Sequence, residues 1–415
     1  MDKNIPQIRF RGFEEQWVEK ELQSIADYKS SGLKASDAKP NGKYTLYDAN
    51  GEIGKTDTYV SNTPYISIIK DGSGVGRVRK LPAQTNCIGT MGCISALSNN
   101  DIDFIFQYLK IKDFSEHIIS GAIPHVYFSE YGKDTLHVPS LPEQEKIGEL
   151  FRNLDNLIDE EQKRLDKLRA LKAALLQKMF PSDNPDNTLN GGGNSLIINN
   201  LQKYDLVITP HPASNTPAIR FRGYTEPWQQ KRLGDMGTFT KGYGYSKSDL
   251  AKNGTPIILY GLLYTNYETN IHNVKTYAKL QDNAVISKGN EVIIPASGET
   301  AEDIARASVI WDKGVILGGD LNVILPNSYI HSSFLALEIT YGNTHTQLVR
   351  KAQGISVVHI HNADIMDIEI SFPSLSEQQQ IGNFFRTQDE QIAHTAQYIT
   401  SLRTIRTALL QKMFV

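Results

Sequence analysis

The sequence predicts an α+β fold in which two α/β domains of irregular sheet are separated by two long antiparallel coiled-coil helices. An internal repeat would relate the two halves by a pseudo-two-fold axis. Three observations lead to this fold class. A string that opens each half occurs twice, a string that closes each half occurs twice, and the closing segments have a heptad spacing of apolar residues.

The repeat has fixed ends and a variable middle. The segment Ile8–Trp17, which begins Ile-Arg-Phe-Arg-Gly-aromatic, recurs as Ile219–Trp228, and Ala174–Phe180 recurs unchanged as Ala408–Phe414. The opening strings lie 211 residues apart and the closing strings 234 (219 − 8 and 408 − 174), so the middles differ in length by 23 residues. We interpret the ends as a common frame that carries two unlike modules.

Two long helices close the two halves. Ser140 with Glu143, and Ser374 with Glu377, fit a capping box in which the serine caps the helix and the glutamate reaches back to the backbone. A heptad period then predicts that the helices pack on each other, although two amphipathic helices that each lie on their own domain remain an alternative. The apolar positions are Ile147, Phe151, Leu154, Ile158, Leu165, Leu168, Leu175 and Met179, then Ile381, Phe385, Ile392, Ile399, Leu402, Leu409 and Met413, with polar breaks at Glu161, Lys172, Gln388, Thr395 and Arg406.

The middles contain short β-branched and aromatic runs between Gly, Asn and Asp residues, as expected for irregular sheet. A stretch rich in Asn, Ser and Gly separates the halves and is typical of a linker. We therefore divide the chain into an opening segment 1–21, a first domain 22–138, a central helix 139–180, a linker 181–217, a second domain 218–372 and a closing helix 373–415.

Composition is that of an ordinary globular protein, with 40% hydrophobic and 21% charged residues in 415. We expect a cytoplasmic protein, because the N-terminus lacks a signal-peptide core and no apolar stretch is long enough to cross a bilayer. Cys87 and Cys93 are expected to be buried thiols. The net charge of −3 is unusual for a lone DNA-binding domain, so any nucleic-acid contact would need locally concentrated cations or charge from partners.

Several strings resemble enzyme motifs but lack a required residue. The stretch before Thr56 ends like a phosphate-binding loop, but Ala49 stands where the first glycine belongs, and Gly72–Gly76 has its third glycine one residue early for a dinucleotide site. His359 and His361 have no evident further metal ligands. We therefore expect no catalytic residues, no metal and no cofactor in this chain.

Cations, aromatic residues and flexible glycines in the middles are candidates for binding DNA. The turn around Gly72–Gly76 is flanked by basic residues that could meet phosphates or guanine edges, although a solvated hairpin explains it equally well. The expected DNA-binding residues are Lys29, Ser30, Lys70, Ser73, Arg77, Arg79, Lys80 and His125 in the first middle, and Lys241, Tyr243, Tyr245, Lys247, Ser297, Thr300, Arg306, His359 and His361 in the second.

The repeated strings resemble the specificity subunit of type I restriction-modification systems, the HsdS family. The matching segments are Ile8–Trp17 and Ile219–Trp228, the helix starts Pro139–Ile147 and Pro373–Ile381, and the two Leu-Leu-Gln-Lys-Met-Phe helix ends. The match spans both repeats, whereas the middles correspond only in position and length. The long linker departs from the family pattern.

The resemblance implies a non-catalytic subunit in which 22–138 and 218–372 are target-recognition domains. Each would read half of a bipartite double-stranded DNA site, and the helices would set the spacer. Partners would be two methylation subunits, which bind S-adenosylmethionine, and restriction subunits, which use ATP and Mg. The alternative function is a coiled-coil interaction adaptor without sequence-specific DNA binding. A stand-alone enzyme is the third, and no motif favours it.

Overall fold

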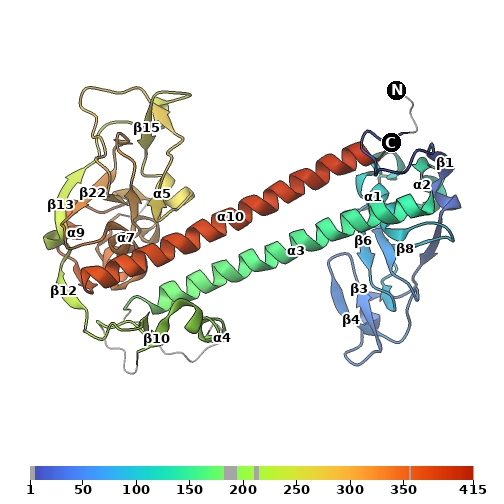
Figure 1. Cartoon of the computed structure of the whole chain (residues 1–415), viewed down its shortest axis with the longest axis horizontal. Helices are drawn as coiled ribbons and strands as arrows, with labels where there is room; N and C mark the ends of the chain where they lie inside the picture. Colours follow the sequence, from blue (N-terminus) through green and yellow to red (C-terminus); the bar gives the residue numbers. More distant parts are fainter. Residues whose placement is uncertain (1–4, 182–193, 210–214, 355–356, 415) are drawn as a thin grey trace. The chain divides into compact units, whose positions relative to one another are not determined.

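The computed structural model describes residues 5–181, 194–209, 215–354 and 357–414, which form two compact units (Figure 1). Unit 1 comprises Met1–Lys163 and Ala396–Val415, and unit 2 comprises Arg164–Thr395. Both units mix helices and open sheets, which agrees with the expected fold class. None of the described helices combines the length and the hydropathy needed to cross a membrane.

Unit 1 is built on a four-stranded antiparallel sheet in the order β2-β8-β5-β6, with a three-stranded sheet β4-β3-β7 and a ribbon β1-β9. Helix α1 packs on the larger sheet, and the buried Cys87 and Cys93 are free thiols, as expected. The elements are β1 Val18–Glu21, β2 Ala26–Ser30, β3 Tyr44–Tyr47, β4 Glu52–Thr56, β5 Tyr65–Ile69, β6 Val78–Leu81, β7 Thr85–Cys87, β8 Met91–Ala96, α1 Ile102–Ile111, α2 Phe128–Tyr131 and β9 Thr135–Val138.

Unit 2 has the corresponding sheets, in the orders β13-β22-β18-β20-β16 and β14-β17-β15-β21, and the ribbon β12-β24. Two further ribbons, β10-β11 and β19-β23, complete it. The strands are β10 Leu206–Ile208, β11 Ile219–Phe221, β12 Gln229–Arg232, β13 Gly237–Lys241, β14 Leu250–Ala251, β15 Thr255–Ile258, β16 Asn270–Ile271, β17 Tyr277–Ala278, β18 Glu291–Pro295, β19 Ser297–Gly298, β20 Ser308–Ile310, β21 Ile316–Leu317, β22 Leu321–Pro326, β23 Val358–His359 and β24 Glu369–Phe372. The shorter helices are α4 Asn194–Ile198, α5 Leu262–Thr265, α6 Ala301–Ile304, α7 Ser332–Tyr341, α8 Asn343–Lys351 and α9 Asn362–Met366.

Helices α3 (Leu141–Lys178) and α10 (Leu375–Met413) are continuous and begin directly after Ser140 and Ser374, as predicted (Figure 1). Each contributes a segment to both units, so the alternative in which each helix lies on its own domain is wrong. In unit 1, side-chain hydrogen bonds join Asp155 of α3 to Arg406 of α10 and Gln162 of α3 to Arg403 of α10, so the helices run antiparallel. The direction follows because the α10 partner number falls as the α3 number rises.

Two of the polar breaks in the heptad stripes form ion pairs. Arg406 binds Asp155 in unit 1, with Nε 2.5 Å from Oδ1, and Lys172 binds Asp389 in unit 2. A charged pair in an apolar seam favours one alignment of two helices, because a slipped register would leave both charges without a partner. These breaks therefore help to fix the register of α3 on α10.

The closing strings complete the two cores reciprocally. Phe414, which follows α10, packs in unit 1 against Trp17 and Phe104, with ring centroids 6.5 and 5.2 Å away. Phe180, which follows α3, packs in unit 2 against Trp228 and Phe334, at 6.3 and 5.9 Å. Each unit is thus finished by the end of the helix that begins in the other. This exchange gives the opening tryptophan and the closing phenylalanine of the repeat a shared structural role.

The glutamates of the predicted capping boxes bind arginine instead of the helix backbone. Arg9 Nε and Nη2 donate to the two carboxylate oxygens of Glu143 over 2.7 and 2.8 Å. Arg220 does the same to Glu377 over 2.9 and 2.7 Å. A planar guanidinium matches a carboxylate in this forked geometry, which makes the pair strong and directional. The capping-box interpretation of these glutamates is therefore wrong, and the ion pair joins the opening string to the helix start.

The glutamine that follows each of these glutamates binds the start of a second helix. Gln144 Oε1 accepts from the backbone N–H of Asp101, the N-cap of α1, over 3.0 Å, and Gln378 Oε1 accepts from His331, the N-cap of α7, over 2.9 Å. A Cβ on Gly148 would lie 2.3 Å from Asp101 Oδ1, so this approach requires glycine. The Glu-Gln pair in each repeat therefore positions both the opening string and the helix that packs on the sheet.

The described part of the segment expected to be a linker contains regular structure. α4 and β10 lie within it, and β10 pairs with β11, the opening string of the second repeat. Leu206 is 2% exposed, and Tyr204 packs edge-on against Phe384 with ring centroids 5.2 Å apart. Apolar residues of this segment therefore belong to the core of unit 2, while Gly191–Gly193 lie outside the described residues.

Candidate nucleic-acid interface

One end of the larger sheet of unit 1 carries most of the binding residues expected there. β2 ends at Ser30, β5 ends at Ile69 and β8 begins at Met91, and these termini meet because neighbouring strands run antiparallel. The turn after β5 closes when Ile69 N–H donates to the carbonyl of Arg77 over 2.9 Å. The residues that this end gathers are Lys29, Ser30, Lys70, Ser73, Arg77 and His125.

The loop that holds His125 is tied to this turn by the backbone. Lys70 N–H donates to Thr90 over 3.0 Å, Val126 N–H donates to Lys70 over 2.9 Å, and Asp71 forms a bridge with His125. Lys70 also lies 3.4 Å from the Asp71 carboxylate, and that acid partly offsets its charge. The end of the sheet is therefore a fixed platform of three loops and not a single flexible turn.

Unit 2 has the same platform with different side chains. Ala296 N–H donates to Asp320 over 2.8 Å, Ile360 N–H donates to Ala296 over 3.0 Å, and Ser297 pairs with His359. These bonds match those of unit 1 one for one. The expected residues gathered here are Lys241 at the end of β13, Tyr243, Ser297 and His359. His125 and His359 thus occupy equivalent places, as do Asp71 and Ser297.

Two arginines of unit 1 border a cavity of about 200 Å³ beside this platform. Arg77 and Arg79 both donate through Nη2 to the carbonyl of Ala49, over 2.5 and 2.9 Å. Ala49 is therefore part of the site as a backbone acceptor, which its side chain could not have indicated. The shared acceptor holds two guanidinium groups side by side while leaving several of their N–H donors available.

Four expected residues are engaged in contacts that stabilise the fold. Lys80 binds the buried Asp103, which also pairs with Arg152 of α3 at 2.7 Å. The other three lie in unit 2, where Thr300 caps α6, Arg306 lies 5.7 Å above the ring of Tyr267, and His361 is the N-cap of α9. The sequence alone could not distinguish these residues from those of the platform, because the same polar residue types form helix caps, ion pairs and ligand contacts.

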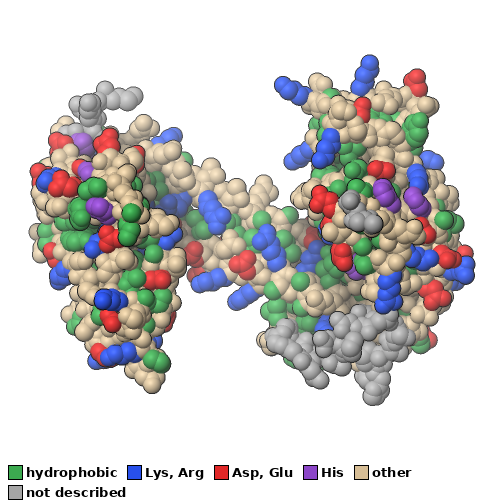
Figure 2. Space-filling view, turned by 180° about the vertical axis from the view of Figure 1, so that it is seen from behind, with side chains coloured by type: hydrophobic (Ala, Val, Ile, Leu, Met, Phe, Trp, Pro, Cys, Tyr) green, Lys and Arg blue, Asp and Glu red, His purple; other side chains and the backbone are tan. Residues whose placement is uncertain are grey.

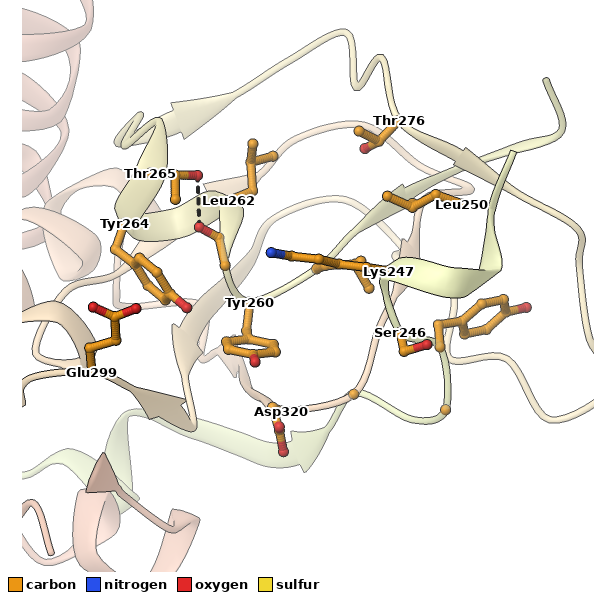
Figure 3. Close-up of a pocket in the computed structure, with 15 residues that line it drawn as sticks. Ser246, Lys247, Leu250, Tyr260, Leu262, Tyr264, Thr265, Thr276, Glu299 and Asp320 are labelled. Atoms are coloured by element: carbon orange, nitrogen blue, oxygen red, sulfur yellow. Dashed lines mark hydrogen bonds between the residues drawn. The ribbon is translucent and has the colours of Figure 1, made fainter. Parts of the chain in front are cut away.

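A pocket of unit 2 was not predicted as a whole from the sequence. Its volume is about 920 Å³, and Tyr245 and Lys247 line it together with residues from four other segments. Figure 3 shows Lys247 extending into it and the Tyr264 side chain beside Glu299. The residues that sequence reasoning left out of the site are Tyr260, Tyr264, Glu299 and Asp320, of which the i, i+4 tyrosines were the one local signal.

Tyr245 is held in an unusual conformation at the pocket rim. Its φ is +56°, a left-handed value that is costly for a bulky side chain. Its hydroxyl donates to the carbonyl of Lys279 over 3.2 Å and accepts from Gln281 N–H over 2.8 Å.

Burial, the neighbouring Tyr260 and the Glu299 carboxylate raise the pKa of Tyr264, so the Tyr264 hydroxyl stays a protonated donor at neutral pH.

Charge on the described surface is mixed. On the face drawn in Figure 2, Lys and Arg side chains are interspersed with Asp and Glu on both units. Within residues 5–181, 194–209, 215–354 and 357–414, no group of three or more His, Cys, Asp or Glu side chains is arranged to hold a metal ion. Recognition at these platforms would therefore depend on a few aimed side chains and not on a broad positive field.

Comparison with known proteins gives a consistent family. The model of the type I restriction modification DNA specificity domain matches residues 14–170 and again residues 225–403. A protein of Mycoplasma genitalium strain G37, curated as "Putative type I specificity subunit", is 28% identical over 185 residues, which is 42% of this chain and 47% of that protein. The chain thus spans about half the length of the curated relative it matches.

Solved structures resemble the fold. The crystal structure of a type I restriction-modification S subunit from M. genitalium superposes with a TM-score of 0.62 at 17% identity, covering 99% of both chains. An HsdS subunit from Thermoanaerobacter tengcongensis gives a TM-score of 0.40 at 15% identity over 96% of both chains. The first of these two comparisons shows that this chain has the same arrangement of helices and strands as the M. genitalium S subunit.

Proposed function

The chain belongs to the family of type I restriction-modification DNA specificity proteins, and on this premise we propose that it is the non-catalytic subunit that reads a bipartite DNA site. The observation that carries the proposal is the pair of equivalent platforms with unlike side chains, each on the same repeated frame. A frame used twice with different readers fits a site with two different halves. The family match favours this function over a coiled-coil adaptor without DNA specificity.

Each platform would read one half-site, with 22–138 and 218–372 as the target-recognition domains. In unit 1 the arginine pair offers donors of the kind that recognise guanine O6 and N7. In unit 2 the pocket offers aromatic rings and carboxylates. Two platforms with different hydrogen-bonding groups would favour different bases, so the two half-sites are expected to differ in sequence.

Helices α3 and α10 would set the number of base pairs between the half-sites and dock two methylation subunits. Those subunits would supply S-adenosylmethionine and the methyl transfer, while restriction subunits would supply ATP-dependent and Mg-dependent cleavage. Partner subunits would also provide part of the phosphate neutralisation, in keeping with a chain of net charge −3. The role of this chain is then recognition and geometry.

Methylome sequencing of cells that express the chain with its methylation subunits tests the proposal directly. We expect one bipartite motif that contains methylated adenine in both halves. A continuous motif, or no motif beside a demonstrably active partner, would contradict it. A catalytically inactive methylation subunit, expressed with the same chain, is the control for background methylation.

A heptad inserted at equivalent positions of α3 and α10 tests the division of labour. Seven helical residues add about 10 Å, which is about three base pairs of DNA. The spacer should lengthen by about that number while both half-sites keep their sequence. Altered half-sites with an unchanged spacer would refute the assignment of spacing to the helices.

A further inference from the structure

We propose that the pocket of unit 2 is the base-reading subsite of the second half-site, in which the Asp320 carboxylate accepts a hydrogen bond from the exocyclic amino group of a cytosine or adenine. The inference rests on the proposed function and names the chemistry of one reader. Its starting point is the cavity of about 920 Å³, a volume typical of sites that hold small groups.

The pocket lies beside the unit 2 platform. Ala296 N–H donates to the Asp320 carbonyl, and Ser297 Oγ donates to Asp320 Oδ2 over 3.2 Å. Both contacts come from the residues that follow β18, the strand whose counterpart in unit 1 leads into the arginine turn. The carboxylate is therefore oriented by the platform itself.

The lining suits a nucleobase edge. Tyr260 and Tyr264 supply aromatic rings, Leu250 and Leu262 supply apolar walls, and Lys247 supplies a positive charge that can meet a phosphate or a carbonyl oxygen. Amino groups on cytosine N4 and adenine N6 are the donors that aspartate and glutamate accept in the major groove. A carboxylate can only accept, so it rejects the acceptor-rich edge of guanine.

Equivalent residues of the two platforms differ in their side chains. Tyr260 follows β15 as Ala49 follows β3, and Ala49 is the residue that holds Arg77 and Arg79. The place of Ala49 is therefore taken by an aromatic residue in unit 2, and Asp320, whose carbonyl accepts from Ala296 N–H, stands where Thr90 stands in unit 1. DNA phosphates repel an acid, and the amino group of a base supplies the donor that offsets this repulsion.

Asp320→Asn is a closely matched variant. It keeps the shape, replaces one acceptor oxygen by an amide donor and tolerates the left-handed φ of +57° at this position. Asp235→Asn, on an exposed acid of unit 2 outside the pocket, is the control. Both are assembled with the methylation subunits, and thermal melting checks that they fold.

Binding is measured to duplexes in which each cytosine or adenine of the second half-site is replaced in turn by 2-pyrimidinone or purine, which lack the amino group. The native complex should lose about 10- to 100-fold in affinity at one position. Asp320→Gly, assembled and checked in the same way, removes both acceptor oxygens and tolerates the left-handed φ, so it should be weaker with normal DNA and insensitive to that replacement. Asp320→Asn keeps one acceptor oxygen and should retain part of that sensitivity. The control should behave like the native complex.

Equal sensitivity of the native complex and Asp320→Gly at every position would overturn the inference, as would an effect confined to the first half-site. If the native complex recognises a bipartite motif but substitution of Asp320 changes no base preference, the proposed function stands and only the role of Asp320 is removed. No bipartite motif in the native complex would remove the proposed function itself, so the two failures are distinguishable.

Discussion

Arg220→Ala should be among the most destabilising single substitutions in unit 2. The Arg220 and Glu377 side chains are 4% and 1% exposed, and two hydrogen bonds join them. Removing the guanidinium leaves a buried carboxylate without its counter-charge and also removes the 2.8 Å bond from Nη1 to the Glu226 carbonyl. Breaking a buried pair from one side costs about 3–5 kcal/mol.

The free energy of unfolding is measured by urea titration, followed by tryptophan fluorescence and circular dichroism. Arg222→Ala is the matched control, because Arg222 is in the same string but pairs with Asp205 where both side chains are about two thirds exposed. An exposed pair contributes at most about 1 kcal/mol. The double variant Arg220→Ala with Glu377→Ala should recover part of the loss, since no charge is then left buried.

A stability loss for Arg220→Ala that matches the loss for Arg222→Ala would refute the argument. It would mean that the carboxylate of Glu377 finds water or another donor when the arginine is absent. A double variant less stable than the single one would show that lost packing, and not an isolated charge, accounts for the cost.

Three further outcomes are expected. Phe180→Ala should cost unit 2 about 3–5 kcal/mol by urea titration, because a fully buried ring is removed from the cluster with Trp228; a loss under about 1 kcal/mol would count against the exchange of helix ends. Reversing the pair by Lys172→Asp with Asp389→Lys should restore thermal stability lost in either single variant, whereas additive losses would show that the pair does not fix register. Burial raises the pKa of Glu338 well above 4.5, so the folded state keeps a proton that the unfolded state releases, and stability declines as pH rises above 4.5 toward the folded-state pKa. Glu338→Gln should flatten that dependence in melts taken from pH 4.5 upward, and an unchanged slope would exclude Glu338 as its cause.

The frame could be predicted from sequence because its signals are local or repeated. Ser140 and Ser374 marked the helix starts, and the heptad stripes indicated a packed helix pair. The same strings gave a wrong prediction for the partners of Glu143 and Glu377, because a glutamate at this position fits both a capping box and a long-range ion pair. The partner, Arg9 or Arg220, lies more than 130 residues away, which no local pattern reports.

The platforms were only partly predictable for a similar reason. Lys70, Ser73 and Arg77 are close in sequence, whereas His125 lies in a separate loop more than 40 residues further along the chain. The pocket of unit 2 combines five separated segments, so the i, i+4 spacing of Tyr260 and Tyr264 was its one local signal and Asp320 carried none. Lys80 and Arg306 look identical to surface cations in the sequence, and only their contacts with Asp103 and Tyr267 show that they are held by the fold.

The exchange of helix ends has a consequence for the order in which the protein folds during synthesis. Unit 1 contains the first 163 residues but also needs Ala396–Val415, so its core waits for the last part of the chain to be made. Unit 2 is contiguous from Arg164 to Thr395 and has all its parts earlier. The half that is made first should therefore be the half that folds last, and until then Trp17 and Phe104 lack the ring of Phe414 that completes their cluster.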